Sequence, residues 1–142
     1  MSGRPVPSRR TLLCSAAAVS VTALGAAACG PGGESGVAAA PTAPVDLGAE
    51  SDVARGSIKL YREHNVVVGR AEDGSLKAFS TVCTHAGCAI DRLEEKNRLV
   101  CPCHGSEFDA RTGEVLHAPA TQPLEQLSVG ARDGRIVAGP GA

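Results

Sequence analysis

Aromatic residues are scarce in this 142-residue sequence, which has two Phe, one Tyr and no Trp. A core built from Val, Leu, Ile and Ala in so short a chain is thin, and a covalent or metal crosslink would add the missing support. Charge of one sign is also lacking, because 14 Lys and Arg stand against 15 Asp and Glu. Since phosphate binding needs a basic surface, this balance argues against a nucleic-acid-binding function.

Residues 1–28 have the pattern of an export signal. The twin arginines Arg9 and Arg10 in SRRTLL precede the apolar run CSAAAVSVTALGAAA. This run is Ala-rich and bounded by small residues, which suits a cleaved signal better than a permanent membrane span. The pattern predicts export by the twin-arginine (Tat) pathway to the outer face of the cytoplasmic membrane. An uncleaved N-terminal anchor helix is the alternative.

The end of this signal resembles a bacterial lipobox, in which a cysteine becomes the lipidated first residue. Cys29 lies in the stretch GAAACG, with Ala26 at the position where Leu is usual. The same alanines would serve as an ordinary A-x-A cleavage site, so both readings stay open. Residues 29–44 are rich in Gly, Pro and Ala, cannot build a core, and read as a tether. A tether favours a lipid anchor on Cys29.

Residues 45–142 are expected to form one all-β domain, because no stretch keeps a helical period. Short runs rich in β-branched or alternating residues are separated by turn signals such as Asp133-Gly134, which predicts a hairpin. The expected strands are 58–61, 66–68, 76–79, 98–100, 127–129 and 135–137. Strands this short predict packed antiparallel sheets.

Two loops, CTHAGC at 83–88 and CPCHGS at 101–106, carry the candidate metal ligands. Each loop offers one cysteine and one histidine, and each has one further cysteine. The residues in question are Cys83, His85 and Cys88, and Cys101, Cys103 and His104. A site with two irons and a Cys₂His₂ zinc site use the same ligand types. Zinc sites usually pair C-x₂₋₄-C with H-x₃₋₅-H, which these mixed loops do not.

The two loops together resemble the paired motifs of the Rieske [2Fe–2S] family, in its disulfide-containing branch related to bc₁-type proteins. The resemblance continues through Phe108-Asp109, TGEV at 112–115 and Ala118-Pro119-Ala120, and covers residues 45–142. It implies a small domain of antiparallel sheets with a two-loop tip that binds one [2Fe–2S] cluster. It also implies the site residues: Cys83 and Cys101 on one iron, His85 and His104 on the other, and a disulfide between Cys88 and Cys103.

The resemblance also marks residues that surround the cluster. Ser106 stands where high-potential relatives place a hydroxyl that donates to a sulfide, and Pro119 belongs to a loop covering the cluster. Phe108 replaces a Tyr that donates to a cysteine sulfur, which predicts a potential below that of bc₁-type proteins. Ala86 replaces the bulky Leu of respiratory relatives, and His117 is expected at the surface.

The implied function is one-electron transfer outside the cytoplasmic membrane, with oxidoreductase activity only as part of a larger complex. The expected partners are donor and acceptor proteins or quinol. The larger complex would be of bc₁ type, or an exported oxidoreductase such as an arsenite-oxidase-type enzyme. A catalytic oxygenase would need a second domain with a mononuclear iron, for which no chain remains. A zinc-binding lipoprotein without a redox role is the remote alternative.

Overall fold

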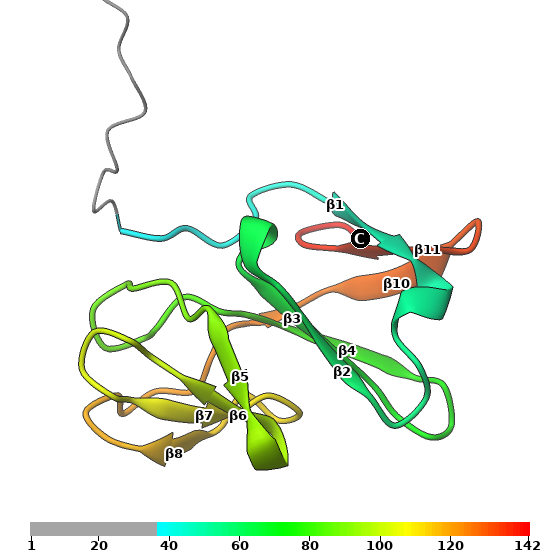
Figure 1. Cartoon of the computed structure of the whole chain (residues 1–142). Helices are drawn as coiled ribbons and strands as arrows, with labels where there is room; N and C mark the ends of the chain where they lie inside the picture. The colour runs from blue at the N-terminus through cyan, green and yellow to red at the C-terminus, as the bar shows by residue number, and fades with distance from the viewer. Residues whose placement is uncertain (1–36) are drawn as a thin grey trace, which may run out of the picture. The chain divides into compact units, whose positions relative to one another are not determined.

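The computed structural model describes residues 37–142, which form three antiparallel sheets without an α-helix (Figure 1). The first sheet has the strand order β1-β11-β10, the second β2-β3-β4-β9 and the third β5-β6-β7-β8. The expectation of an all-β domain of packed antiparallel sheets is therefore confirmed. Among the described residues, no helix is long and apolar enough to cross a membrane.

The strands are short throughout, as the spacing of turn signals predicts. Those of the first sheet are β1 (Val45–Ala49), β10 (Val129–Arg132) and β11 (Arg135–Ala138). Those of the second are β2 (Ile58–Tyr61), β3 (Val66–Arg70), β4 (Leu76–Ser80) and β9 (Gln126–Leu127). Those of the third are β5 (Arg92–Glu94), β6 (Arg98–Val100), β7 (Glu107–Asp109) and β8 (Val115–His117). Three short 3₁₀ turns connect them: η1 (Glu50–Asp52), η2 (Arg62–His64) and η3 (Glu95–Asn97).

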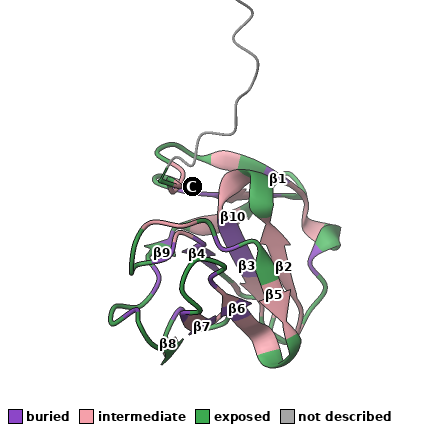
Figure 2. Cartoon of the chain, turned by 60° about the vertical axis from the view of Figure 1, so that its left-hand side comes forward, coloured by how far each residue is buried: buried purple, intermediate pink, exposed green. Residues whose placement is uncertain are grey.

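The middle sheet has a hydrophobic core on each of its faces. Successive strand residues point to opposite faces, so Val67 packs into one core while Val66 and Val68 pack into the other. All three valines are fully buried, whereas the last two residues of β3 are partly exposed (Figure 2). The core that contains Val67 also contains Phe108 from the third sheet. Packing against this core fixes the third sheet, which carries the second of the two cysteine loops.

The hairpin predicted around Asp133-Gly134 is present between β10 and β11. Both turn residues have positive φ, 51° and 74°, as a two-residue hairpin turn of the favoured kind requires. The predicted strand 127–129 is wrong as a single element. Leu127 ends β9 in the second sheet and Val129 begins β10 in the first, because the chain crosses between sheets at Ser128.

The segment 37–44, the C-terminal part of the expected tether, lies against the domain. The Ala38 N–H donates to the Gly87 carbonyl oxygen at 2.8 Å, and Asn65 Nδ2 donates to the Ala39 carbonyl oxygen at 3.0 Å. We call residues 37–44 the strap. The predicted signal 1–28, Cys29 and the rest of the expected tether lie outside the described residues.

Candidate metal centre

The two cysteine loops share one backbone conformation. In each, the N–H of the first cysteine donates to the carbonyl oxygen five residues later, 2.8 Å for Cys83 and 2.9 Å for Cys101. In each, the glycine four residues after that cysteine donates back to its carbonyl oxygen, with Gly87 at 2.8 Å and Gly105 at 3.1 Å. These glycines have φ of 73° and 75°, a region that favours glycine. The repeated turn presents equivalent side chains from both loops.

The first cysteine of each loop is a buried free thiol. Cys83 and Cys101 are each only 2% exposed and belong to the core that also contains Phe108. Burial raises the pKa of the Cys101 thiol, and the neighbouring Cys83 side chain raises that pKa further. The backbone N–H groups of Cys103 and His104 hydrogen-bond to the Cys101 sulfur and lower its pKa. A cation bound beside the Cys101 sulfur would favour its thiolate form.

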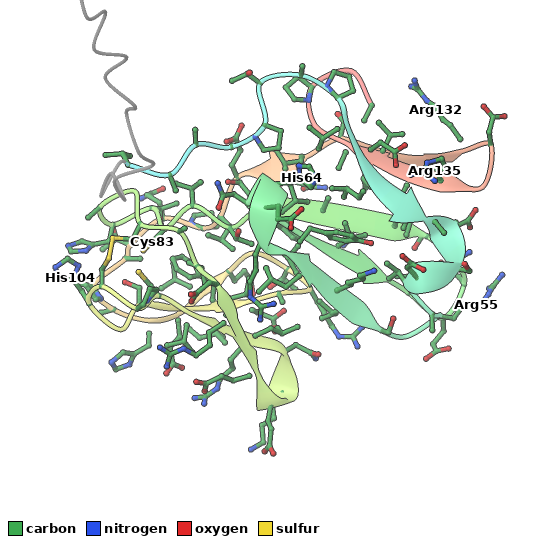
Figure 3. All side chains as sticks on the ribbon, turned by 45° about the horizontal axis from the view of Figure 1, so that its top comes forward. Arg55, His64, Cys83, His104, Arg132 and Arg135 are labelled. Carbon is green, nitrogen blue, oxygen red and sulfur yellow. A yellow bond between two sulfur atoms is a disulfide. The ribbon has the colours of Figure 1, made fainter. Side chains whose placement is uncertain are left out.

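The two histidines lie next to each other on the exposed side of the loops. The ring centroids of His85 and His104 are 4.9 Å apart and the ring planes are nearly perpendicular, at 87°. Both residues are exposed, unlike the thiols. Figure 3 shows Cys83 and His104 together at one end of the domain, opposite Arg55 and Arg135. The loops thus offer two sulfur donors on the inside and two nitrogen donors on the outside.

The remaining cysteines form a disulfide, Cys88–Cys103, which joins the two loops. This is the pairing that the family resemblance implied. The sulfur atoms of Cys88, Cys101 and Cys103 all lie within 4.8 Å of one another. Because the disulfide consumes two of these three sulfurs, Cys101 is the member of this group that can offer a thiolate.

A third segment, residues 116–123, which comprises the end of β8 and the loop after it, closes the site from the side. The Ala120 N–H donates to Ser106 Oγ at 3.0 Å, and both residues are buried. Thr84 Oγ1 donates to the Gln122 carbonyl oxygen at 2.6 Å. Since Ser106 uses its oxygen as an acceptor here, its own O–H remains available as a donor. Pro119, at the exposed turn of this loop, follows a cis peptide bond.

Two further residues named from the sequence have clear places. Phe108 on β7 is fully buried in the core beside both thiols, so it packs against the site without offering a hydroxyl. His117 ends β8 and is exposed. Cys29 lies outside the described residues.

The strap is the part of the site that sequence reasoning missed. The Val37 side chain lies over Gly87, where an added Cβ would come within 2.5 Å of Val37 Cγ1. Asn65 connects the strap to the second sheet. Its side-chain amide donates to the Ala39 carbonyl oxygen, and its own carbonyl oxygen accepts the Thr81 N–H at 2.8 Å. Nothing in the sequence signals these contacts, since they join positions far apart along the chain.

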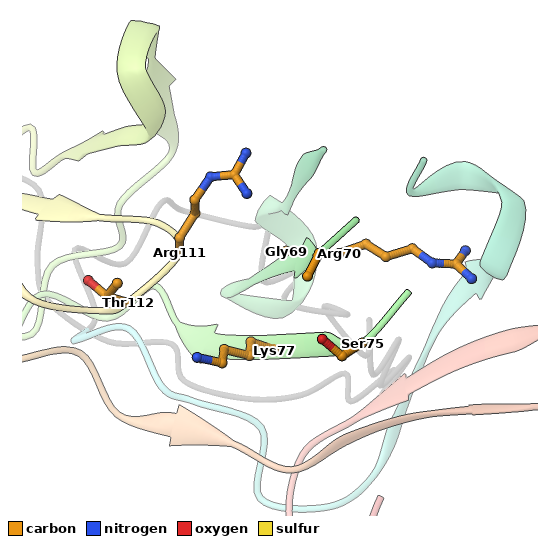
Figure 4. A pocket seen from close by; sticks show the side chains of 7 residues that line it. Gly69, Arg70, Ser75, Lys77, Arg111 and Thr112 are labelled. Carbon is orange, nitrogen blue, oxygen red and sulfur yellow. The ribbon is translucent and has the colours of Figure 1, made fainter. Parts of the chain in front are cut away.

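A cavity lies on the second sheet, away from the cysteine loops (Figure 4). It has a volume of about 190 Å³ and is lined by Gly69, Arg70, Ala71, Ser75, Lys77, Arg111 and Thr112. Two of its guanidinium groups are already engaged: Arg70 pairs with Glu50 at 2.6 Å, and Arg111 donates to the Gly56 carbonyl oxygen at 2.8 Å. These contacts draw both side chains outward, which leaves a mostly apolar hollow without a converging ligand set.

The donor set at the loops fits an iron–sulfur cluster with mixed ligation. Two adjacent buried thiols and two adjacent exposed imidazoles are the ligand types that such a cluster uses. The raised pKa of Cys101 agrees with a site built for a bound cation, because iron offsets the cost of a buried thiolate. The disulfide keeps the two surplus cysteines from competing for the metal.

Comparison with known proteins agrees with this chemistry. Residues 43–128 match the family profile of the Rieske [2Fe-2S] domain. The chain is 37% identical over 92 residues to the cytochrome b6-f complex iron-sulfur subunit of Chlorobaculum tepidum, covering 64% of this chain and 50% of the relative. The chain therefore spans about half the length of the curated relatives it matches.

Solved structures share the fold. The plasma membrane Rieske protein PetC3 from Synechocystis PCC 6803 superimposes with a TM-score of 0.53 at 32% identity, over 66% of this chain and 97% of that one. The ferredoxin of carbazole 1,9a-dioxygenase from Nocardioides aromaticivorans IC177 has a TM-score of 0.50 at 27% identity, over 70% of this chain and 99% of that one.

Proposed function

The chain belongs to the Rieske [2Fe-2S] family and is an iron–sulfur electron-transfer protein, and we propose that it works outside the cytoplasmic membrane as a tethered one-electron carrier. The observation that carries this proposal is the pair of matching loops, with buried thiols, exposed imidazoles and a disulfide between them. When bound, a Rieske cluster accepts and returns one electron at about −150 to +300 mV.

The four ligands are assigned by the donor types and their exposure. Cys83 and Cys101 would hold the inner iron, because they are the free thiols and lie in the core. His85 and His104 would hold the outer iron, because their rings are adjacent and exposed. Replacing two thiolates by neutral imidazoles removes two negative charges, which makes the cluster easier to reduce.

The exposed imidazoles are the route for electrons and protons. Their outer nitrogens face solvent or a partner, while the thiol side is covered by Phe108 and the rest of the core. A ligating imidazole changes its affinity for a proton when the charge on the iron changes. Through these two rings, His85 and His104 would couple electron uptake at a bound cluster to proton uptake.

Oxidising conditions outside the cytoplasm suit the disulfide between Cys88 and Cys103, which supports the predicted Tat export. The proteins named above include a cytochrome b6-f complex subunit and a plasma membrane Rieske protein, and the second of these supports a membrane-associated role. Between the two larger complexes, we favour an exported oxidoreductase over a quinol-oxidising bc₁-type complex. Ala86, exposed beside His85, offers only a methyl group at the tip where respiratory relatives carry a bulky side chain.

The test is an EPR spectrum of the reduced mature protein together with iron and sulfide analysis. We expect a rhombic signal of mixed nitrogen and sulfur ligation and two irons per chain. A colourless, EPR-silent protein with one zinc would overturn the redox function. The ligand assignment is tested by variants: Cys101→Ser and His104→Ala should lose the cluster, whereas Cys103→Ser should still assemble it. The reverse outcome for the two cysteines would refute the assignment.

A further inference from the structure

The strap attaches at the cluster loops. Its first described residue, Val37, lies over Gly87, and the Ala38 N–H binds the Gly87 carbonyl oxygen at 2.8 Å. Gly87 lies in the loop between His85 and the disulfide cysteine Cys88. An anchor within residues 1–36 would therefore be connected to the domain at the end that carries the cysteine loops. The C-terminus lies on the first sheet (Figure 1).

The strap is fixed to the domain at several points along its length. Asn65 Nδ2 holds the Ala39 carbonyl oxygen at 3.0 Å. Further along, the Ala43 carbonyl oxygen lies so close to Gly139 that an added Cβ there would come within 2.6 Å of it. The chain then enters β1 at Val45. Because the strap is held at its start, middle and end, its first residue stays beside the cysteine loops. The preceding part of the chain therefore joins the domain next to these loops.

The four chain segments near the two histidines contain no charged side chain, and we call the surface that they share the uncharged face. It is formed by the strap, by both cysteine loops at 83–88 and 101–106, and by residues 116–123, which are joined by the bonds Ala38–Gly87, Thr84–Gln122 and Ala120–Ser106. None of the residues in these four segments is Asp, Glu, Lys or Arg, although such residues make up 20% of the chain. Two large apolar side chains are exposed on these segments, Val37 at 79% and Leu116 at 51%.

We propose that the strap forms part of the docking face and turns this uncharged face toward the membrane, where it meets a membrane-bound redox protein with an uncharged docking surface. This inference rests on the tethered carrier proposed above and on the lipid anchor that the sequence favours at Cys29, eight residues before Val37. Eight residues span ~29 Å when fully extended. A flexible linker of that length has an r.m.s. span of only about 15 Å.

These spans are short compared with the domain itself. A folded chain of this size has a radius of gyration of about 13 Å, hence a diameter of about 33 Å. The tether joins the domain beside Gly87. Moving the cysteine loops one domain diameter away from the membrane would therefore require the tether to be fully extended. A soluble carrier that relies on charge steering gains nothing from an uncharged face, whereas a partner confined to the same surface needs no steering.

The first experiment measures how close the cluster lies to the membrane. The mature lipidated protein is bound to phosphatidylcholine vesicles with and without a gadolinium-chelating lipid, and the microwave power saturation of the reduced cluster is recorded by EPR. We expect faster spin relaxation with gadolinium present. Inserting about 16 Gly/Ser residues between Gly32 and Gly33 lengthens the r.m.s. span about 1.7-fold and should weaken the effect. The same insertion after Ala142 is the matched control and should not.

The hydrogen bond that pins the strap is tested by Ala38→Pro, which removes the N–H that binds Gly87. This variant should also weaken the gadolinium effect. Ala40→Pro is the matched control, because among the described residues no hydrogen bond of the Ala40 N–H is found. Vesicle-bound protein without any gadolinium effect, or an effect that the inserted tether leaves unchanged, would overturn the inference. Failure to bind vesicles would instead refute the lipid anchor, and the inference with it.

The second experiment measures the charge preference of the docking face by voltammetry of the mature protein on coated gold electrodes. We expect electron exchange on methyl-terminated monolayers at least as fast as on carboxylate- or ammonium-terminated ones. Val37→Lys should shift the preference toward carboxylate, whereas Ala131→Lys, a change at an exposed position on β10, should not. Fast exchange of the unmodified protein on one charged surface alone would refute an uncharged docking face.

Discussion

Removing the disulfide should lower the stability of the domain by an amount that the loop length sets. Cys88 and Cys103 are 15 residues apart in sequence. A crosslink closing a loop of this length stabilises the folded state by about 3 kcal/mol, mainly by restricting the unfolded chain. For a domain of this size, 1 kcal/mol shifts the melting temperature by about 4–8 °C. The double variant Cys88→Ser/Cys103→Ser should therefore melt ~12–24 °C below the native protein.

The structure explains why other costs of this substitution are small. Cys103 is exposed, so its serine replacement is solvated, and Cys88 is only half-buried. The loops also keep their bonds to the rest of the domain at Thr84, Ser106 and Gly87. The variant should consequently fold and assemble its cluster, with the loss confined to the crosslink.

The assay compares the holoproteins by scanning calorimetry and by loss of visible cluster absorbance at one heating rate. A bound cofactor breaks two-state behaviour, so the melting temperatures are compared directly and are not converted to absolute free energies. Replacing both cysteines avoids a lone thiol beside Cys101 that could compete for iron. A shift of less than about 4 °C would correspond to under 1 kcal/mol and would refute the loop-entropy reasoning.

Three other changes give separate results. Ser106→Ala should lower the reduction potential and, by leaving the buried Ala120 N–H without its acceptor, cost about 1–3 kcal/mol in denaturant unfolding. Changing Arg9-Arg10 to Lys-Lys should stop export, measured as loss of the protein from the membrane fraction. The hydrogen bond from Arg135 lowers the pKa of Asp46 below its ordinary value of 3.8. Its contribution to stability is thus complete above pH 3.8 and lost as the pH falls through the lower folded pKa, so Asp46→Asn should flatten the acid limb of a stability–pH curve.

Each of these predictions has a control or an outcome that would refute it. Thr84→Ala removes an exposed bond between the other cysteine loop and the segment 116–123, and it should leave the potential of the cluster nearly unchanged. Normal export of the Lys-Lys variant would refute the Tat prediction. An unchanged acid limb in Asp46→Asn would refute the contribution of the Arg135 bond. An unchanged potential in Ser106→Ala would show that its O–H does not act on the cluster.

Part of the fold was readable from local sequence. The strands β2 and β6 have the bounds that their apolar runs predict, and the Asp133-Gly134 turn lies where it was expected. Among the missed strands, β5, β7 and β8 have three residues each, and β1 has five residues interrupted by a register shift between Asp46 and Gly48. Segments this short carry too few alternating positions to show a period, and they are strands because they pair with a neighbour.

The chemistry of the site was determined by the sequence alone, and its arrangement by the tertiary structure. The spacing of cysteines and histidines in 83–88 and 101–106 identifies the donor types and the family, because metal ligands must be supplied by particular side chains at short intervals. Which face is buried, how the segment 116–123 closes on Ser106, and that the strap ends on Gly87 were decided only in the folded chain. Such contacts join residues distant in sequence, and they depend on the packing of three sheets around two cores, which no local pattern records.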